Sequence, residues 1–315
     1  MQTDATFHKY SVLVPELRLP VLSYLNSATL LNYGQCSKTC EAEMQNFNTK
    51  APAKVMIMQK DDGVEIFCCY PKLFDEDETQ HKQPVAPFSC WQIPTSDEMM
   101  ENTVTTLKKV YLRVREGSTR KLVISLNEWP TQLMNIGLWS KLEYLIVYGQ
   151  TSMMNEFLTF AETTTIKVKE LNLRRFNEGR NYTHAPMENI KPLFKSRWFK
   201  QLEYVVIGLK YAVDEEDFMN VTNTKAYFVV PHRTISDDTI RRKVAQLNSL
   251  PIACEINMYL VHDFSIRFDL RTLFPNHRFN RKGSEVRVGN VLISYLDRRR
   301  NLCIKKENTS SSNNV

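Results

Sequence analysis

A short phrase of apolar residues recurs along the chain, and it is the feature that most constrains the fold. The pattern is apolar-x-x-apolar-x-apolar, and its last two apolar positions have the two-residue spacing of side chains on one face of a β-strand. Between the clear copies lie stretches with helical spacing, at 131–139, 153–162 and 187–199. The copies are Leu107–Val110–Leu112, Leu142–Leu145–Val147, Val168–Leu171–Leu173 and Leu202–Val205–Ile207, with a weaker one at Ala253–Ile256–Met258.

Strands that alternate with crossover helices in one order predict parallel strands with helices on one side. The intervals between the first four copies are 35, 26 and 34 residues. Leucine-rich repeats are shorter and more regular, at about 20–29 residues. The sequence therefore predicts an irregular, leucine-rich-repeat-like α/β domain over 104–300. The alternative is an α/β layer that never becomes a horseshoe.

The segment 13–47 has the spacing of short helices. Leu22 and Leu25 share one helical face, and Leu30 and Leu31 belong to the next helix. Three short helices bury little area alone, so such a module needs a partner or the rest of the chain to cover it. We expect α+β architecture, with a small all-helical module over 1–50 followed by the repeat domain.

The segment 51–103 predicts a hairpin and a connector. Two short strands, 55–58 and 64–70, flank Asp61-Asp62-Gly63, which is a hairpin signal. The acidic run 75–78 and the following Pro-rich stretch indicate a flexible loop. We also expect a disordered tail over 301–315, because that end is polar and rich in Ser and Asn.

Charge and cysteine content exclude several classes. The net charge of +6 is mild, although residues 265–315 hold 11 Lys/Arg against 4 Asp/Glu. The seven cysteines include no Cys-x-x-Cys pair, which favours free thiols in a reducing compartment over a zinc site. The chain has neither a signal peptide nor an apolar run of the ~20 residues that span a bilayer. We expect a cytoplasmic or nuclear protein with no membrane partner.

Motifs of catalysis are missing from the sequence. It contains no phosphate-binding glycine loop, no His-Glu-x-x-His and no Gly-x-Ser-x-Gly. The six histidines are scattered without metal-ligand spacing. We therefore predict that the chain is not an enzyme and uses no cofactor, metal or catalytic residue.

The N-terminal segment resembles an F-box. The residues that carry the resemblance are Val14-Pro15-Glu16, Leu22-Ser23-Tyr24-Leu25, Leu30-Leu31 and Cys36-Ser37-Lys38. The following region is similar to the F-box-associated region of the expanded nematode F-box families, through Leu171 to Leu173, Trp198 and Leu202-Glu203-Tyr204. The stretch 14–25 is about one residue shorter than usual and contains Pro20, which departs from the family pattern.

The resemblance implies a substrate receptor of a Skp–cullin–F-box ubiquitin ligase. The N-terminal helices would bind a Skp-type linker protein, and through it a cullin, while the repeat domain would hold an unknown protein substrate. The predicted linker contacts, or the packing behind them, are Pro15, Leu22, Leu25, Leu30 and Leu31. The predicted substrate contacts are Tyr111, Arg113, Tyr144, Tyr148, Asn172, Arg174 and Tyr204, because Tyr and Arg are enriched at binding hot spots.

Two other functions fit the sequence. A repeat scaffold without a ligase role needs no linker, and its segment 13–47 would be a helical cap. Weak nucleic-acid binding would use the basic C-terminal region, including Arg298-Arg299-Arg300, Lys305 and Lys306. No recognised nucleic-acid module accompanies these residues, so we do not expect nucleic acid as the main partner.

Overall fold

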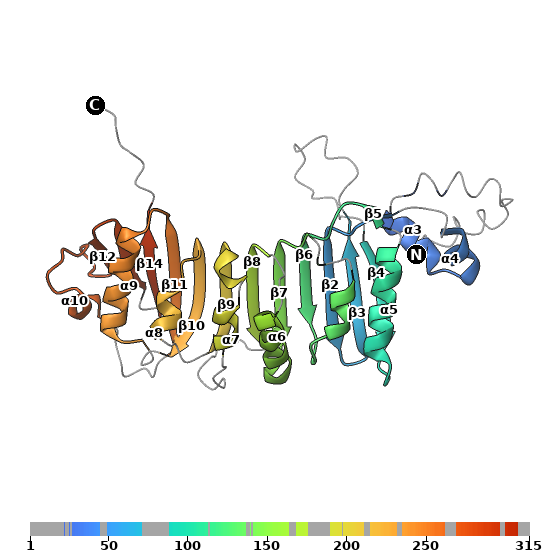
Figure 1. The fold of residues 1–315 in the computed structure, drawn as a ribbon, viewed down its shortest axis with the longest axis horizontal. Coiled ribbons are helices and arrows are strands. Elements are labelled where there is room, and N and C mark those ends of the chain that lie inside the picture. Colours follow the sequence, from blue (N-terminus) through green and yellow to red (C-terminus); the bar gives the residue numbers. More distant parts are fainter. Residues whose placement is uncertain are drawn as a thin grey trace, which may run out of the picture. The chain divides into compact units, whose positions relative to one another are not determined.

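The structure is a computed structural model, and the chain divides into two compact units. The N-terminal unit comprises 1–124 and 130–142, and the C-terminal unit comprises 125–129 and 143–315. Figure 1 labels the elements of both units. The structure describes residues 22, 25, 27–44, 49–70, 88–112, 114–136, 139, 141–163, 168–175, 190–196, 198–210, 215–231, 235–261, 269–296 and 300–307.

The sheet of the N-terminal unit has the order β6-β2-β3-β4. Its strands are β2 (Lys54–Lys60), β3 (Gly63–Cys69), β4 (Phe88–Pro94) and β6 (Lys121–Ser125). The short strands β1 (Thr49–Lys50) and β5 (Val114–Glu116) pair in parallel beside it. The predicted hairpin is confirmed, because β2 and β3 are antiparallel with Lys60 opposite Gly63. Gly63 has φ +145°, and a Cβ there would lie 2.0 Å from the Ile93 carbonyl oxygen, so the position requires glycine.

The described helices of this unit are α3 (Ser27–Gly34), α4 (Lys38–Met44), α5 (Met99–Leu112) and the 3₁₀ turn η1 (Thr131–Asn135). Helix α3 packs against α4 and β4, and α5 packs against β3 and β4. Val104, Leu107 and Val110 form the buried stripe of α5. The strand expected at the phrase Leu107–Val110–Leu112 is therefore wrong, because the three-residue step from Leu107 to Val110 also fits a helix.

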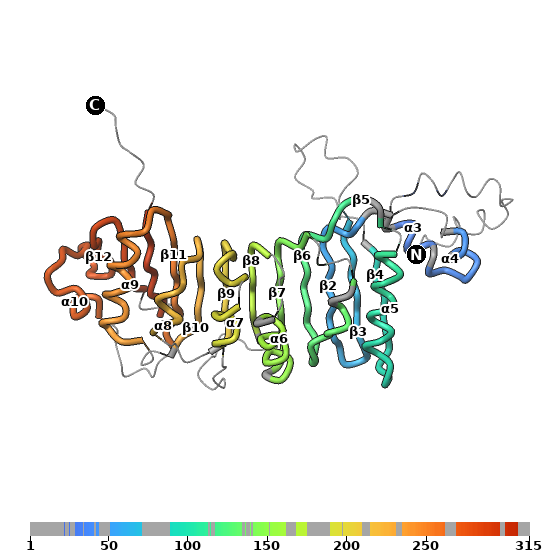
Figure 2. The backbone as a smooth tube through the Cα atoms, in the orientation of Figure 1, coloured from blue at the N-terminus to red at the C-terminus, as the bar shows by residue number. Residues whose placement is uncertain are grey.

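Eight strands are described in the C-terminal unit, in the order β12-β13-β14-β11-β10-β9-β8-β7. Strands β7 (Tyr144–Gly149), β8 (Glu170–Arg175), β9 (Tyr204–Lys210), β10 (Lys225–Pro231) and β11 (Cys254–Val261) run in parallel. Strand β14 (Asn301–Lys306) then pairs antiparallel with β11 and with β13 (Val291–Leu296), which pairs antiparallel with β12 (Glu285–Val288). The tube in Figure 2 shows β11, β10, β9, β8 and β7 following one another in this order.

Helices cover one face of this sheet, as Figure 1 shows for α6 to α9. They are α6 (Thr151–Thr163), α7 (Lys191–Lys195), η3 (Phe199–Gln201), α8 (Glu215–Met219) and α9 (Asp237–Ser249), and the short α10 (Leu270–Leu273) follows β11. Helix α6 packs on β7, and α9 packs on β13 and β14. The core under the helices is a continuous row of fully buried side chains across all eight strands, namely Leu145, Leu171, Val205, Ala226, Ile256, Ile304, Ile293 and Val286.

The turns that lead into the parallel strands are stacked by hydrogen bonds. The Lys169 amide donates to the Glu143 carbonyl, the Glu203 amide donates to the Lys169 carbonyl, and the Lys225 amide donates to the Glu203 carbonyl. The buried Asn223 adds two bonds from its side-chain nitrogen, to the carbonyls of Phe199 (3.2 Å) and Leu202 (2.7 Å). The strands therefore begin at a common edge, which fixes their register.

The expected fold class is wrong. Over the described residues the fold is a sheet-dominated α/β fold with one twelve-stranded sheet, one two-stranded sheet and few helices, not a small all-helical module followed by a domain. The helices α3 and α4 belong to a unit that also contains the hairpin and α5, because the apolar side of α3 packs on β4. Residues 301–306, expected within a disordered tail, form β14, and 308–315 lie outside the described residues.

Candidate functional site on the open face of the C-terminal sheet

The side chains that alternate with the core row project from the other face of the C-terminal sheet, which we call the open face. On β7, for example, Leu145 and Val147 are buried, whereas Tyr144, Ile146 and Tyr148 are half-buried. The half-buried or exposed members of the open face on β7 to β11 and β14 are Tyr144, Ile146, Tyr148, Glu170, Asn172, Arg174, Tyr204, Lys225, Tyr227, Glu255, Asn257, Tyr259, Asn301, Cys303 and Lys305. Large side chains with free surface thus cover six neighbouring strands.

Five of these side chains are tyrosines, and the parallel register places them on one face of β7 to β11. Tyr144 and Tyr204 lie in one row across the sheet, with Glu170 of β8 between them. The next position of this row is Lys225, whose Nζ lies 5.7 Å from the centroid of the Tyr204 ring. A cation over a tyrosine face is attracted by the ring quadrupole. The contact therefore favours one orientation of a half-buried aromatic side chain.

The next row brings Tyr227 into the same surface. Val206 of β9 lies opposite Tyr227 and is only 6% exposed, although the alternation of β9 turns it to the open face. Val229, two residues after Tyr227, is fully buried on this side as well. The middle of the open face therefore has an apolar floor, Val206 and Val229, between larger aromatic side chains, and aromatic residues are enriched at protein-binding hot spots.

Hydrogen bonds between neighbouring polar side chains hold the rest of the face. The Arg174 Nε donates to the Asn172 Oδ1 at 2.9 Å. The Asn257 Nδ2 donates to the Glu255 Oε1 at 2.7 Å, and the Asn301 Nδ2 donates to the Asn257 Oδ1 at 3.3 Å. These bonds restrict the rotamers of groups that a partner would contact, which lowers the entropy lost on binding.

The structure brings together five of the seven predicted substrate contacts. Tyr144, Tyr148, Asn172, Arg174 and Tyr204 all lie on the open face. The remaining two belong to the misread first phrase of the pattern. Tyr111 is in α5 of the N-terminal unit, where its hydroxyl bonds to the Thr119 hydroxyl, and Arg113 lies outside the described residues.

Sequence reasoning missed Tyr227 and Tyr259, which are as central to the open face as the predicted tyrosines. Both stand in strands that lack the full leucine phrase. The signal that could have found them is strict alternation, since Ala226 and Phe228 flank Tyr227 and are buried, as are Met258 and Leu260 beside Tyr259.

The predicted linker contacts have a different environment. Leu22, Leu30 and Leu31 are 0%, 4% and 5% exposed within this chain, so little of their surface is free. Leu25 is half-buried, and its amide donates to the Leu22 carbonyl at 3.1 Å. Pro15 lies outside the described residues.

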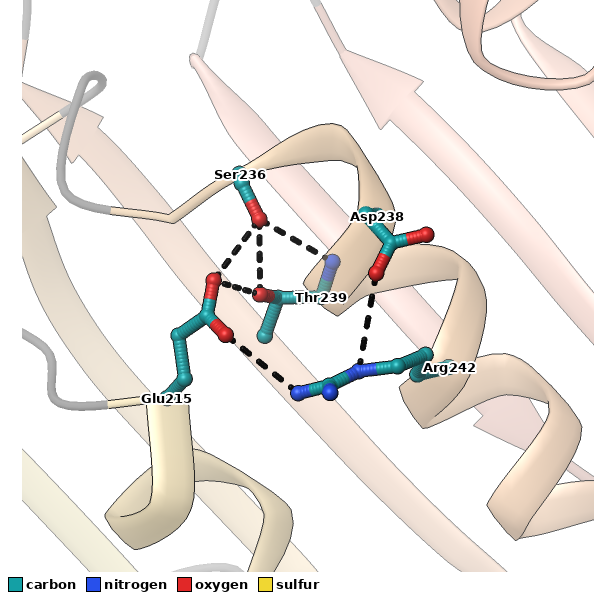
Figure 3. A network of polar contacts seen from close by, with 5 residues as sticks. All are labelled: Glu215, Ser236, Asp238, Thr239 and Arg242. Atoms are coloured by element: carbon teal, nitrogen blue, oxygen red, sulfur yellow. Dashed lines mark hydrogen bonds and ion pairs between the residues drawn. The ribbon is translucent and has the colours of Figure 1, made fainter.

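A polar cluster away from the open face ties α8 to α9 (Figure 3). Ser236 caps α9, since its Oγ accepts from the Thr239 amide at 3.2 Å, and it donates to the Glu215 Oε1 at 2.8 Å. The Thr239 hydroxyl also donates to Glu215, and the Arg242 Nη2 lies 3.3 Å from the other Glu215 oxygen. Every contact is internal, so we assign this cluster to helix docking and not to a ligand.

Within the described part of the chain, no group of three or more His, Cys, Asp or Glu is placed to hold a metal ion. The described helices include none that is long and apolar enough to span a bilayer. Comparisons of the chain with protein-family models, with curated proteins and with solved structures found no match.

Proposed function

We propose that the chain is a non-enzymatic adaptor that holds a protein partner on the open face of its C-terminal sheet. The single observation that carries this proposal is the set of five half-buried tyrosines, which project from β7, β9, β10 and β11 around an apolar floor. Tyrosine offers a large contact area at the cost of only two side-chain torsions, and it is enriched at protein-binding hot spots.

The dimensions of the open face suit such a partner. Six neighbouring strands at about 4.8 Å spacing give a width of about 24 Å. A helix with its side chains is about 10–12 Å across, so the surface accommodates a helix or an extended segment with contacts on both sides. The mixture of Tyr, Asn and Arg supplies both apolar area and hydrogen-bond donors.

We further propose, from the sequence resemblance, that the partner is the substrate of a cullin–RING ubiquitin ligase. In this proposal the region of α3 and α4 binds a Skp-type linker protein. The burial of Leu22, Leu30 and Leu31 limits the surface that this region can offer, so Leu25 and its surroundings would have to make the contact.

Binding of the linker is tested with purified proteins. The wild type and a Leu25→Asp variant are captured on an immobilised Skp-type linker. Leu22→Asp is unsuitable because a charge at a fully buried site would unfold the chain. Capture of the wild type together with loss in the folded Leu25→Asp variant supports the ligase role. If the folded wild type is not captured, the ligase role is wrong and the scaffold function takes its place.

The open face is tested separately. A Tyr204→Ser, Tyr227→Ser variant and a matched control with two exposed residues changed elsewhere in the unit, Lys169→Gln and Lys200→Gln, are compared by quantitative affinity capture. A protein retained by the wild type and the control, but lost from the tyrosine variant, is then purified and its dissociation constant measured. We expect at least a tenfold weakening in the tyrosine variant. Equal affinity for all three proteins contradicts the proposal.

A further inference from the structure

The loop that follows α10 concentrates exposed positive charge on an ordered segment. Four basic side chains between residues 271 and 282 are exposed, namely Arg271, Arg278, Arg281 and Lys282, and together we call them the basic loop. The carboxylates in and beside this segment are both engaged. Asp269 accepts from the Arg271 amide at 2.9 Å, and Glu285 accepts from the Asn280 side chain at 3.0 Å. With these four basic side chains and two carboxylates, residues 269–285 carry an excess of two positive charges.

A network around Asn280 makes the tip of the loop rigid. The Gly283 amide donates to the Asn280 carbonyl, and the Ser284 amide donates to the Asn280 Oδ1, both at 3.0 Å. This β-turn places Arg281 and Lys282 at its two corners, where both side chains are exposed. Gly283 has φ +68°, as this position of the turn requires.

Arg271 joins the turn from α10. A Cβ added to Gly283 would lie only 2.7 Å from the Arg271 Nη2, so the guanidinium rests against the glycine. Helix α10 is itself fixed to α9, because the Arg241 Nε donates to the Leu273 carbonyl at 2.9 Å. Arg271, Arg281 and Lys282 thus stand on backbone that hydrogen bonds hold in place.

Two other basic residues of this region already have partners within the chain. Lys306 is buried, with 6% of the residue exposed, and its ammonium donates to the carbonyls of Asn248 and Leu250 at the end of α9. Arg287 pairs with Glu307 at 3.0 Å. Lys306, one of the basic residues named for the nucleic-acid alternative, therefore has a structural role in the core.

We propose that the basic loop binds the phosphate backbone of single-stranded nucleic acid. The exposed side chains between 271 and 285 are polar or charged apart from Pro275, so the patch lacks the apolar centre that a protein interface needs. Phosphate contacts require no such centre, and guanidinium groups match phosphate oxygens in a bidentate geometry. This activity is separate from protein recognition on the open face.

Salt dependence gives a quantitative test. Each phosphate contact with a single strand contributes about −0.7 to the slope of log K against log salt concentration, so four contacts predict about −2.8. The probe is a fluorescein-labelled 12-nucleotide oligo-dU, and binding to the full chain is followed by fluorescence anisotropy from 50 to 200 mM salt. A double variant, Arg281→Gln and Lys282→Gln, removes two contacts and should lower the slope to about −1.4.

The control is the Lys169→Gln, Lys200→Gln variant, which removes the same charge from exposed positions outside the loop. We expect it to keep the wild-type slope. The proposal is overturned if the folded wild type does not bind oligo-dU at 50 mM salt, or if control and loop variants lose affinity equally. It is also overturned if poly-L-glutamate displaces the oligonucleotide at equal charge concentration, because the loop would then select acidic peptides as readily as phosphates.

Discussion

Lys243 offers the sharpest test of the packing in the C-terminal unit. It lies in α9, and its side chain is completely buried. Its Nζ donates to the carbonyls of Met219 (2.9 Å) and Val221 (2.6 Å) and to the Gln246 Oε1 (2.8 Å). The ammonium also lies 5.6 Å from the centroid of the Phe218 ring. All these partners are neutral, so the charge is solvated only by dipoles.

Burial lowers the pKa of Lys243 from 10.5 to about 8. A difference of about 2.5 pKa units corresponds to about 3 kcal/mol between the two protonation states. Below pH 8 the lysine is charged in both the folded and the unfolded chain, and the full cost of burying the charge is present. Between pH 8 and 10.5 the folded chain releases its proton while the unfolded chain keeps it. The free energy of unfolding therefore gains about 3 kcal/mol from this group as the pH rises through that window.

The perturbation is Lys243→Met, which keeps the length of the side chain and removes the charge. Urea unfolding of the wild type and the variant is measured at intervals from pH 7 to 10.5. We compare the two proteins because buried thiols also titrate, and burial raises the pKa of the neighbouring Cys254. Relative to the variant, the wild type should gain about 3 kcal/mol across the window. A Lys169→Met control at an exposed position keeps Lys243 and should show the same gain relative to Lys243→Met as the wild type does.

A difference between wild type and Lys243→Met that does not change with pH would refute this reasoning. It would mean that the lysine is hydrated in the folded protein and that its pKa is close to that of a free side chain. A gain of stability with falling pH would contradict the sign as well as the size of the effect.

Three further predictions follow from local geometry. Gly289→Ala should lower the free energy of unfolding by about 1–3 kcal/mol in urea titrations, because φ is +60° there and a Cβ would lie 2.6 Å from the Asn248 Oδ1. Trp198→Phe should lower the free energy of unfolding by about 1–2 kcal/mol in the same assay, since the indole nitrogen donates a hydrogen bond of 2.9 Å to a carbonyl in α6. In the folded protein Ellman's reagent should modify the exposed Cys36 quickly and the fully buried Cys68 only on unfolding.

The strands of the C-terminal unit could be located from sequence because period-two spacing is unambiguous when one face is buried. The phrases at Leu145, Leu171 and Val205 fall on β7, β8 and β9, which run in parallel. The phrase at Leu107 fails because its three-residue step suits a helix equally well. Propensity could not decide between the two, since the deciding contact is the packing of α5 on β3 and β4.

The architecture could not be predicted because it depends on pairing between distant segments. Neither the hairpin signal at Gly63 nor the spacing of the N-terminal leucines reveals that α3 rests on β4. Part of the candidate site could be predicted, since alternation places Tyr144 and Tyr204 on a common face of the sheet. Tyr227 was missed because β10 carries Ala226 instead of leucine in the core row.

The position of β14 has a consequence for the order of assembly. This strand is inserted between β11 and β13, and it is the antiparallel partner of both. A chain that ends before Asn301 would expose two unpaired strand edges and leave the β12–β13 hairpin without its neighbour. Exposed edges of apolar strands are templates for intermolecular pairing. The last described strand thus joins the β12–β13 hairpin to the parallel part of the sheet. A nonsense mutation that removes it should produce aggregates rather than a slightly shorter protein.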